Sequence, residues 1–245
     1  MLILKLPLIF TAVSTLFFIA PFAHCQTLPH YDIQHTTGPI VIDGKADEAA
    51  WKLAKSVGRF HFNNWRVGEK ELTDVSLLWD EQYLYVAYYC HDKHISASVT
   101  QRHGPVSKDD CVEIFVSPDP NKVTNYYTFE INTIGTMLNR CRTDWWTGAK
   151  TWDPEGVVYR TTFQGLERKD ELPEDDHWTV ELAIPFKNFV HDASHTPPRD
   201  GDQWRINLMR IGGITNAQAS TWSPLGPGEG FHTTTAFGWV RFVGH

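Results

Sequence analysis

The sequence predicts an all-β fold, namely an antiparallel β-sandwich of jelly-roll type with one or two short helices. Short runs of β-branched and aromatic residues with alternating polarity recur along the chain, as is typical of strands that bury one face. Clusters of Gly, Pro, Asn and Asp separate these runs and act as turn signals. The sequence contains no long helical periodicity, internal repeat or linker-like stretch. Many short strands with frequent turns favour a sandwich over other folds.

Each expected element is a short run bounded by turn residues. The turn 80–82 joins two strands as a hairpin, and Pro185 ends a strand because it lacks an amide hydrogen for the ladder. Short helices are expected over 47–51 and 186–190. In chain order, the expected strands span 39–44, 60–65, 75–80, 83–89, 111–116, 126–132, 136–142, 157–164, 178–184, 204–211 and 237–243.

The first 25 residues have the features of a secretory signal peptide. An apolar run over 6–23 follows Lys5, and Ala23-His24-Cys25 resembles a cleavage site before Gln26. A membrane anchor is the alternative, although two prolines interrupt the run. A lipoprotein acylated at Cys25 is another, which the preceding His24 fits poorly. We therefore expect a secreted protein, extracellular or periplasmic, with no membrane contact after cleavage.

The rest of the chain has the length of one large β domain. We expect an N-terminal extension over 26–38, a single domain over 39–245, and a monomer. The net charge is −7, with 22 basic and 29 acidic residues and without a basic cluster, so nucleic acid is excluded as a partner. The three remaining cysteines have no zinc-site spacing, and one disulfide with one free thiol is as compatible as three free thiols. These are Cys90, Cys111 and Cys141.

The stretch 109–132 is the part of the chain with the clearest functional pattern. It contains two alternating strands around a turn rich in Pro and Asp. Because strand side chains alternate between faces, Glu113, Glu130 and Asn132 are expected to lie opposite the apolar positions. Such a face is a candidate ligand surface, although alternation alone favours a face that is merely solvated.

Four motifs, in their order and spacing, resemble one known family. They are V-I-D-G followed by D-E and W within 41–51, L-W-D-E followed by Y-L-Y-V within 78–86, D-C-V-E-I-F at 110–115, and T-W-S-P at 221–224 followed by F-G at 237–238. With these motifs the chain resembles the family 9 carbohydrate-binding modules over about 39–242. The resemblance implies a β-sandwich that binds sugar, often attached to polysaccharide-degrading enzymes, with structural calcium in some members. We therefore expect a secreted, non-catalytic glycan-binding protein that acts in polysaccharide breakdown or uptake.

The resemblance carries over part of a sugar site. The family's carboxylate, two amides and one stacking aromatic correspond to Glu113, Asn132, Asn207 and Phe231. Two positions depart, because Glu130 stands where the family has Arg and Ser107 stands near the first stacking Trp. A ring from elsewhere could replace that Trp. The expected carbohydrate-binding set is Glu113, Glu130, Asn132, Asn207, Phe231, Trp145, Trp146 and Trp65.

Three further possibilities stay open from the sequence. Five aspartates are candidate calcium ligands, although such residues more often form turns. They are Asp43, Asp47, Asp109, Asp110 and Asp119.

Glu113 and Glu130 on neighbouring strands could bring their carboxyls to ~5 Å, the spacing of a retaining glycosidase pair. Related sandwiches bind b-type haem through Met or His. A haem site would use Met137 or Met209 with His232 or His103.

Overall fold

The computed structural model describes residues 27–65, 68–93, 95–148, 151–164, 177–213 and 216–244. The expected signal peptide over 1–25 lies outside these residues. Within them, no helix is long and apolar enough to cross a membrane. Cys90, Cys111 and Cys141 are buried free thiols.

Within the described ranges the chain forms twelve strands and four short 3₁₀ helices, in agreement with the all-β prediction. The strands are β1 (His30–His35), β2 (His61–Asn64), β3 (Thr73–Trp79), β4 (Tyr83–His91), β5 (Cys111–Ser117), β6 (Tyr126–Asn132), β7 (Met137–Arg142), β8 (Val158–Gln164), β9 (His177–Pro185), β10 (Gln203–Gly212), β11 (Gln218–Thr221) and β12 (Gly238–Val243). The helices are η1 (Ala49–Leu53), η2 (Val106–Lys108), η3 (Phe186–Phe189) and η4 (Thr234–Ala236).

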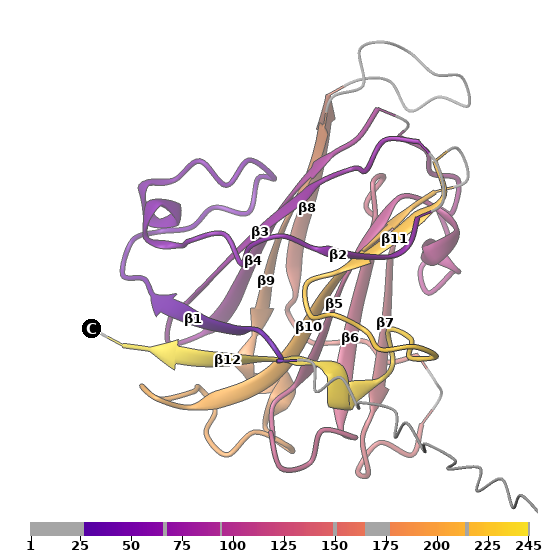
Figure 1. Cartoon of the computed structure of the whole chain (residues 1–245). Coiled ribbons are helices and arrows are strands. Elements are labelled where there is room, and N and C mark those ends of the chain that lie inside the picture. Colours follow the sequence, from indigo (N-terminus) through magenta and orange to yellow (C-terminus); the bar gives the residue numbers. More distant parts are fainter. Residues whose placement is uncertain are drawn as a thin grey trace, which may run out of the picture.

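The strands form one sheet that curls into two facing walls (Figure 1). The strand order is β7-β6-β5-β10-β12-β1-β3-β4-β9-β8, and β11 with β2 branches from β10. One wall therefore contains β5, β6, β7 and β10, and the other contains β3, β4, β8 and β9, with β12 and β1 between them. The pairings are antiparallel except those of β1, which runs parallel to both β12 and β3.

The main core lies between the two walls. Val112, Ile114 and Val116 of β5 face inward, as do Phe129 and Ile131 of β6. The opposite wall contributes Val75, Leu77, Val86, Tyr88, Trp178, Val180 and Leu182. Period-two alternation thus places every second residue of each wall in one core, and the sequence pattern of β5 and β6 is confirmed.

A second apolar cluster covers the outer side of the β3–β4–β9 wall. Ala50 and Trp51 of η1 pack there against Leu78, Tyr85 and Ala183. The segment leading to η1 was expected to contain a strand at 39–44, and this prediction is wrong. Its amide hydrogens are bound by side chains instead of a ladder, since Val41 donates to Glu48 Oε1 (2.9 Å), and Asp43 and Gly44 both donate to Glu181 Oε2 (3.0 and 2.7 Å).

Strand β1 lies inside the segment that we expected to be an extension before the domain. It pairs with β12 over five residues, so these residues belong to the sheet. Its sequence, HYDIQH, alternates, but only Tyr31 and Ile33 supply apolar groups, which is too weak a pattern to predict a strand. Strand β11 was also missed, because four residues with small and polar side chains give no clear period.

Candidate functional site

The register of β5, β6, β7 and β10 aligns a set of polar and aromatic side chains on the side facing away from the core. Glu113 pairs directly with Glu130 on β6 and with Met209 on β10, and Phe115 pairs with Thr128 and Asn207. The same parity continues onto β7, where Arg140 pairs with Thr128. We call this side the Glu113 face. Its members are Cys111, Glu113, Phe115, Tyr126, Thr128, Glu130, Asn132, Leu138, Arg140, Arg142, Asn207 and Met209.

The two glutamates of this face are buried, so the interpretation of a merely solvated face is wrong. Glu113 is 3% exposed and Glu130 is 5% exposed. Polar contacts around them are few: Cys111 Sγ lies 3.9 Å from Glu113 Oε1, Thr128 Oγ1 donates to Glu130 Oε1 at 3.2 Å, and Arg140 Nε lies 3.7 Å from that same oxygen. Burial, and then the charge of Glu130, raises the pKa of Glu113 well above its ordinary value. Burial therefore favours the protonated form of Glu113.

The segment after β11 crosses this face and adds an aromatic cap. Phe237 packs with Phe115, Tyr126 and Met209, and half-buried Phe231 lies against the same cluster. The ring of His232 stacks on Phe115 at 5.0 Å and meets the Tyr126 hydroxyl through Nδ1 at 3.0 Å. Phe231 is thus beside the Glu113 face, as the sequence predicted.

The two amides that we expected in the site are bonded within the protein. Asn132 donates from Nδ2 to Val99 O and Asp109 Oδ2, and its Oδ1 accepts from the Thr136 amide. Asn207 accepts from the Ser223 amide at 2.9 Å and donates to the Ser223 carbonyl at 3.4 Å. Asn207 therefore ties the crossing segment to β10. Both amides therefore hold backbone segments in place. The carboxyl pair of Glu113 and Glu130 is left as the polar centre of the face.

The three tryptophans proposed as replacement rings lie elsewhere. Trp145 donates to Asp192 Oδ2 at 2.8 Å and to the Tyr127 hydroxyl at 3.2 Å, and its ring contacts Trp146. Because Tyr127 points into the core, this pair lies at the end of the core side of β6. Trp65 follows β2, is 40% exposed, and carries Lys70 over its ring at 4.7 Å.

The site prediction missed three residues on or beside the Glu113 face. They are Arg140, Arg142 and His232. The signal for the arginines is the alternation Leu138, Arg140, Arg142 in β7, but it has meaning only when the register with β6 is known. His232 was considered only as a haem ligand. Burial, and then the charges of Arg142 and Arg140, lowers its pKa to about 4, so the ring is neutral at physiological pH.

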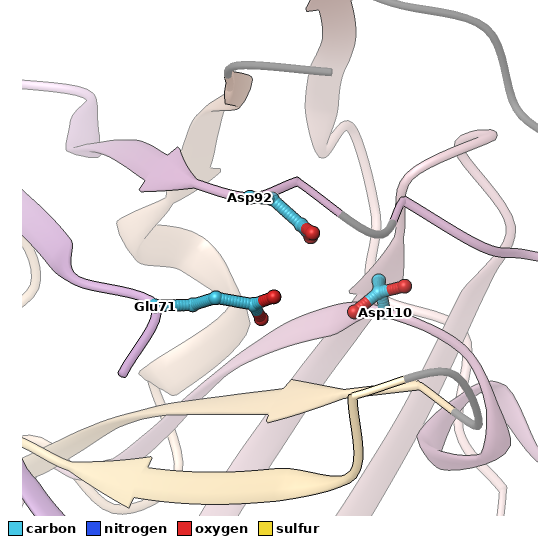
Figure 2. A group of neighbouring side chains, drawn as sticks. All are labelled: Glu71, Asp92 and Asp110. Carbon is cyan, nitrogen blue, oxygen red and sulfur yellow. The ribbon is translucent and has the colours of Figure 1, made fainter. Parts of the chain in front are cut away.

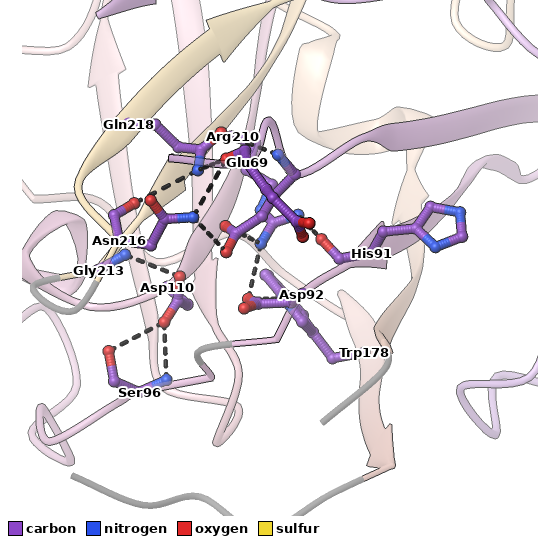
Figure 3. Close-up of polar contacts among 11 residues, drawn as sticks. Glu69, His91, Asp92, Ser96, Asp110, Trp178, Arg210, Gly213, Asn216 and Gln218 are labelled. Carbon is purple, nitrogen blue, oxygen red and sulfur yellow. Dashed lines mark hydrogen bonds and ion pairs between the residues drawn. The ribbon is translucent and has the colours of Figure 1, made fainter. Parts of the chain in front are cut away.

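A second buried polar cluster lies on the core side of β10. The carboxylates of Glu71, Asp92 and Asp110 converge, with ligand atoms within 4.8 Å of one another (Figure 2). The Arg210 guanidinium lies among them and donates from Nη2 to Asp92 Oδ2 at 2.6 Å and to Glu71 Oε2 at 3.2 Å (Figure 3). We call these four residues the Arg210 cluster.

The surroundings of the Arg210 cluster satisfy most of its remaining polar atoms. Asp110 accepts from the Gly213 amide at 2.7 Å and from the amide and hydroxyl of Ser96 at 2.7 and 2.9 Å. Trp178 donates to Asp92 at 3.0 Å, and its ring lies 5.5 Å from the guanidinium carbon. Arg210 Nη1 donates to the His91 carbonyl at 2.8 Å.

The structure therefore argues against calcium at this cluster. Carboxylate oxygens are suitable ligands for the ion, but the fixed positive charge of Arg210 already occupies the space between the acids and would repel a second cation. The aspartates proposed from the sequence do not gather at one point among the described residues. Asp43 binds the Lys45 amide and ammonium, Asp119 binds the Asn121 amide, and Asp47 is exposed. Asp109 binds the Ser98 and Val99 amides.

The candidate haem ligands are spread over both sides of the sheet. Met137 lies in the main core, and His103 contacts Asp153 at 2.9 Å. Met209 and His232 lie on the Glu113 face, where both pack around Phe115. The buried, aromatic surroundings of Met209 resemble ordinary core packing.

Comparison with protein families gives the assignment. The family model described as carbohydrate-binding family 9 matches residues 73–242, more than half of the chain. The chain belongs to carbohydrate-binding family 9. The region matched includes every strand of the Glu113 face, from β5 to β10.

Solved structures agree with this fold. A candidate carbohydrate-binding protein from Bacteroides uniformis superposes with a TM-score of 0.72 at 20% identity, covering 88% of this chain and 100% of that one. A family 9 module from Caldicellulosiruptor kristjanssonii in complex with cellotriose gives a TM-score of 0.62 at 16% identity, with 88% and 94% coverage. The same organism's family 9 module in complex with glucose gives 0.59 at 16% identity, with 87% and 96% coverage. A search of curated proteins finds no match.

Proposed function

We propose that this protein binds a carbohydrate on the Glu113 face. The observation that carries the proposal is the carboxyl pair Glu113 and Glu130, which lies beside an aromatic cap in a family 9 fold. Sugar recognition needs polar groups for hydroxyls and rings for the apolar C–H faces. The pair supplies the first, and Phe231 with His232 supplies the second.

The protonation of the pair suits hydroxyl binding. A protonated carboxyl both donates and accepts, and its ionised partner accepts only. Glu113 and Glu130 together can therefore donate one hydrogen bond to a hydroxyl oxygen and accept several hydrogen bonds from neighbouring hydroxyls. The thin set of protein contacts around these oxygens leaves hydrogen-bonding capacity for a ligand.

The biological role follows from the same family and from the start of the chain. The apolar segment before Gln26 supports secretion, and the structural neighbours include family 9 modules crystallised with cellotriose and glucose. A secreted, non-catalytic protein that captures a glycan during polysaccharide breakdown or uptake is consistent with both.

The test is a glycan array with the mature chain, followed by titration calorimetry on the best ligand. Glu113→Gln keeps the shape of the side chain but removes its ability to donate from a hydroxyl or to ionise. We expect affinity to fall by up to about tenfold, since a hydrogen bond between uncharged groups contributes ~0.5–1.5 kcal/mol.

The matched control is Glu155→Gln, which alters an exposed glutamate paired with Lys187 and should leave affinity unchanged. Folded protein that binds no glycan would contradict the proposal. Binding that survives Glu113→Gln would place the site elsewhere. Incubation of the best ligand with the protein also tests the glycosidase alternative, for which released sugar is required.

A further inference from the structure

Positive charge is concentrated at one end of the Glu113 face. Arg140 and Arg142 alternate with core residues on β7 and therefore point to the same side as Glu130 and Tyr126, their neighbours on β6. The protein as a whole has a net charge of −7. The Glu113 face therefore carries two arginines on a protein that is acidic as a whole.

The charges on the face do not cancel. Arg140 lies 3.7 Å from Glu130 and offsets its carboxylate. Burial and the neighbouring Glu130 raise the pKa of Glu113 and so favour its uncharged form. Arg142 is exposed and has no ion pair or hydrogen bond with any residue of the described ranges. One guanidinium with five donors is therefore available at the rim of the site.

His232 provides a neutral donor next to this guanidinium. The Tyr126 hydroxyl, whose pKa is raised by burial, lies 3.0 Å from His232 Nδ1 and can donate to it. A neutral imidazole that accepts at Nδ1 carries its hydrogen on Nε2. Stacking on Phe115 fixes the ring plane. Tyr126, whose hydroxyl meets this ring, pairs with Arg142 across β6 and β7, so the imidazole and the Arg142 side chain flank the same residue.

We propose that the ligand is an anionic saccharide whose acidic group is bound by Arg142 with the Nε2 hydrogen of His232. The proposal rests on the carbohydrate-binding function above and specifies its substrate class. Planar guanidinium donors match a carboxylate or a sulfate ester, while the Glu113–Glu130 pair binds hydroxyls of the same or the adjacent sugar. The shared chemistry is a negative group on a sugar ring, as in uronic acids or sulfated sugars.

The test compares ligands that differ only in charge. Trigalacturonic acid and its methyl ester separate the carboxylate from the sugar, and a sulfated galactose oligosaccharide with its desulfated form does the same for sulfate. We expect the acidic member of at least one pair to bind about tenfold more tightly than its neutral member. This preference should shrink as ionic strength rises, because an exposed guanidinium is screened by salt.

Two variants locate the effect. Arg142→Gln should abolish the preference for the acidic ligand, so that the charged and neutral members of each pair bind with similar affinity. Arg160→Gln is the matched control, since it removes an exposed arginine on β8 in the opposite wall, and it should retain the preference.

The outcomes separate this inference from the function on which it rests. Equal binding of charged and neutral ligands, both sensitive to Glu113→Gln, overturns the anionic class but supports carbohydrate binding. A preference that persists in Arg142→Gln overturns the assigned residue. Binding of neither kind of saccharide overturns both proposals.

Discussion

Two groups of buried carboxyls lie on opposite sides of the β5–β10 wall, and they differ in what balances them. In the Arg210 cluster, a guanidinium that is 2% exposed donates to Asp92 and Glu71, and backbone and hydroxyl groups bind Asp110. On the Glu113 face, the nearest cation is Arg140 at 3.7 Å, and the other contacts of the pair come from a thiol and a hydroxyl.

The difference indicates two roles for the same chemistry. A buried ionic group that is fully bonded fixes neighbouring segments, and removal of one member leaves the others uncompensated. A buried pair with few partners gains from a ligand that supplies the missing hydrogen bonds. We therefore interpret the Arg210 cluster as a structural connection between β10, β4 and the segments around Glu71 and Asp110, and the Glu113 face as the binding surface.

The largest effect is expected when the cation of the structural cluster is removed. Arg210→Met keeps much of the side-chain volume but leaves Asp92 and Glu71 without their donor. Breaking a buried pair in this way costs about 3–5 kcal/mol of unfolding free energy. Denaturant unfolding monitored by tryptophan fluorescence measures the loss.

Arg241→Met is the matched control for this change. Arg241 also pairs with a carboxylate, Asp32, at 2.7 Å, but both side chains are about half exposed. An exposed pair contributes roughly 0–1 kcal/mol. Losses of similar size in the two variants would contradict the structural role of the Arg210 cluster.

The contrast between the two groups also marks the limit of prediction from the sequence. The strand alternation of 111–132 placed Glu113 and Glu130 together and opposite Phe129 and Ile131, because that information is local and has a period of two. The all-β fold was predictable for the same reason. Burial of the two glutamates was not, since it depends on which segments cover the sheet, and the crossing segment with Phe231 and His232 comes from about a hundred residues further along the chain.

The Arg210 cluster could not be predicted at all from local patterns. Its members come from four separate segments, and Arg210 lies 139 positions from Glu71 in the chain. Asp110 was considered as a calcium ligand, but only the folded structure shows that an arginine supplies the positive charge. Similarly, the β7 arginines join the site through strand register, which the sequence of β7 alone does not contain.

The second prediction concerns pH. Burial raises the pKa of Glu113 well above its ordinary value, of Glu71 to about 8 and of Asp110 to about 7, with Glu130 or Asp92 adding to the shift. Each of these pKa values is higher in the folded protein than in the unfolded chain. At a pH between the two values, the folded protein therefore binds more protons than the unfolded chain. Stability should accordingly fall as pH rises from about 5 to about 8.

Glu113→Gln assigns part of this slope to the binding face. The variant cannot ionise, so its unfolding free energy should fall less steeply over the same range, and at about pH 8 it should equal or exceed that of the wild type. Glu155→Gln, at an exposed ion pair, should retain the full slope. If the wild-type protein became more stable toward pH 8, the carboxyls of the Glu113 face and of the Arg210 cluster would be better compensated than the structure indicates.

The smallest loss of stability is expected for a change of Glu71 in the Arg210 cluster. Glu71 and Asp92 both contact Arg210, and the third prediction distinguishes their roles. Glu71 has its pKa raised to about 8 by burial and by Asp92, so at neutral pH it is mostly uncharged. Asp92 Oδ2 accepts from both Arg210 Nη2 and Trp178 Nε1, at 2.6 and 3.0 Å, and it is the carboxylate best placed to balance the guanidinium.

Glu71→Gln should thus cost only about 1 kcal/mol at neutral pH, mainly through the 3.2 Å contact with Arg210, where an amide group would replace an acceptor. Asp92→Asn should cost roughly 3 kcal/mol or more, because it removes the charge that Arg210 requires in a dry environment. Chemical unfolding of the two variants side by side at neutral pH gives the comparison. If Glu71→Gln proves the more damaging, the negative charge of the cluster resides on Glu71, and the proton that we assign to it belongs to a neighbour.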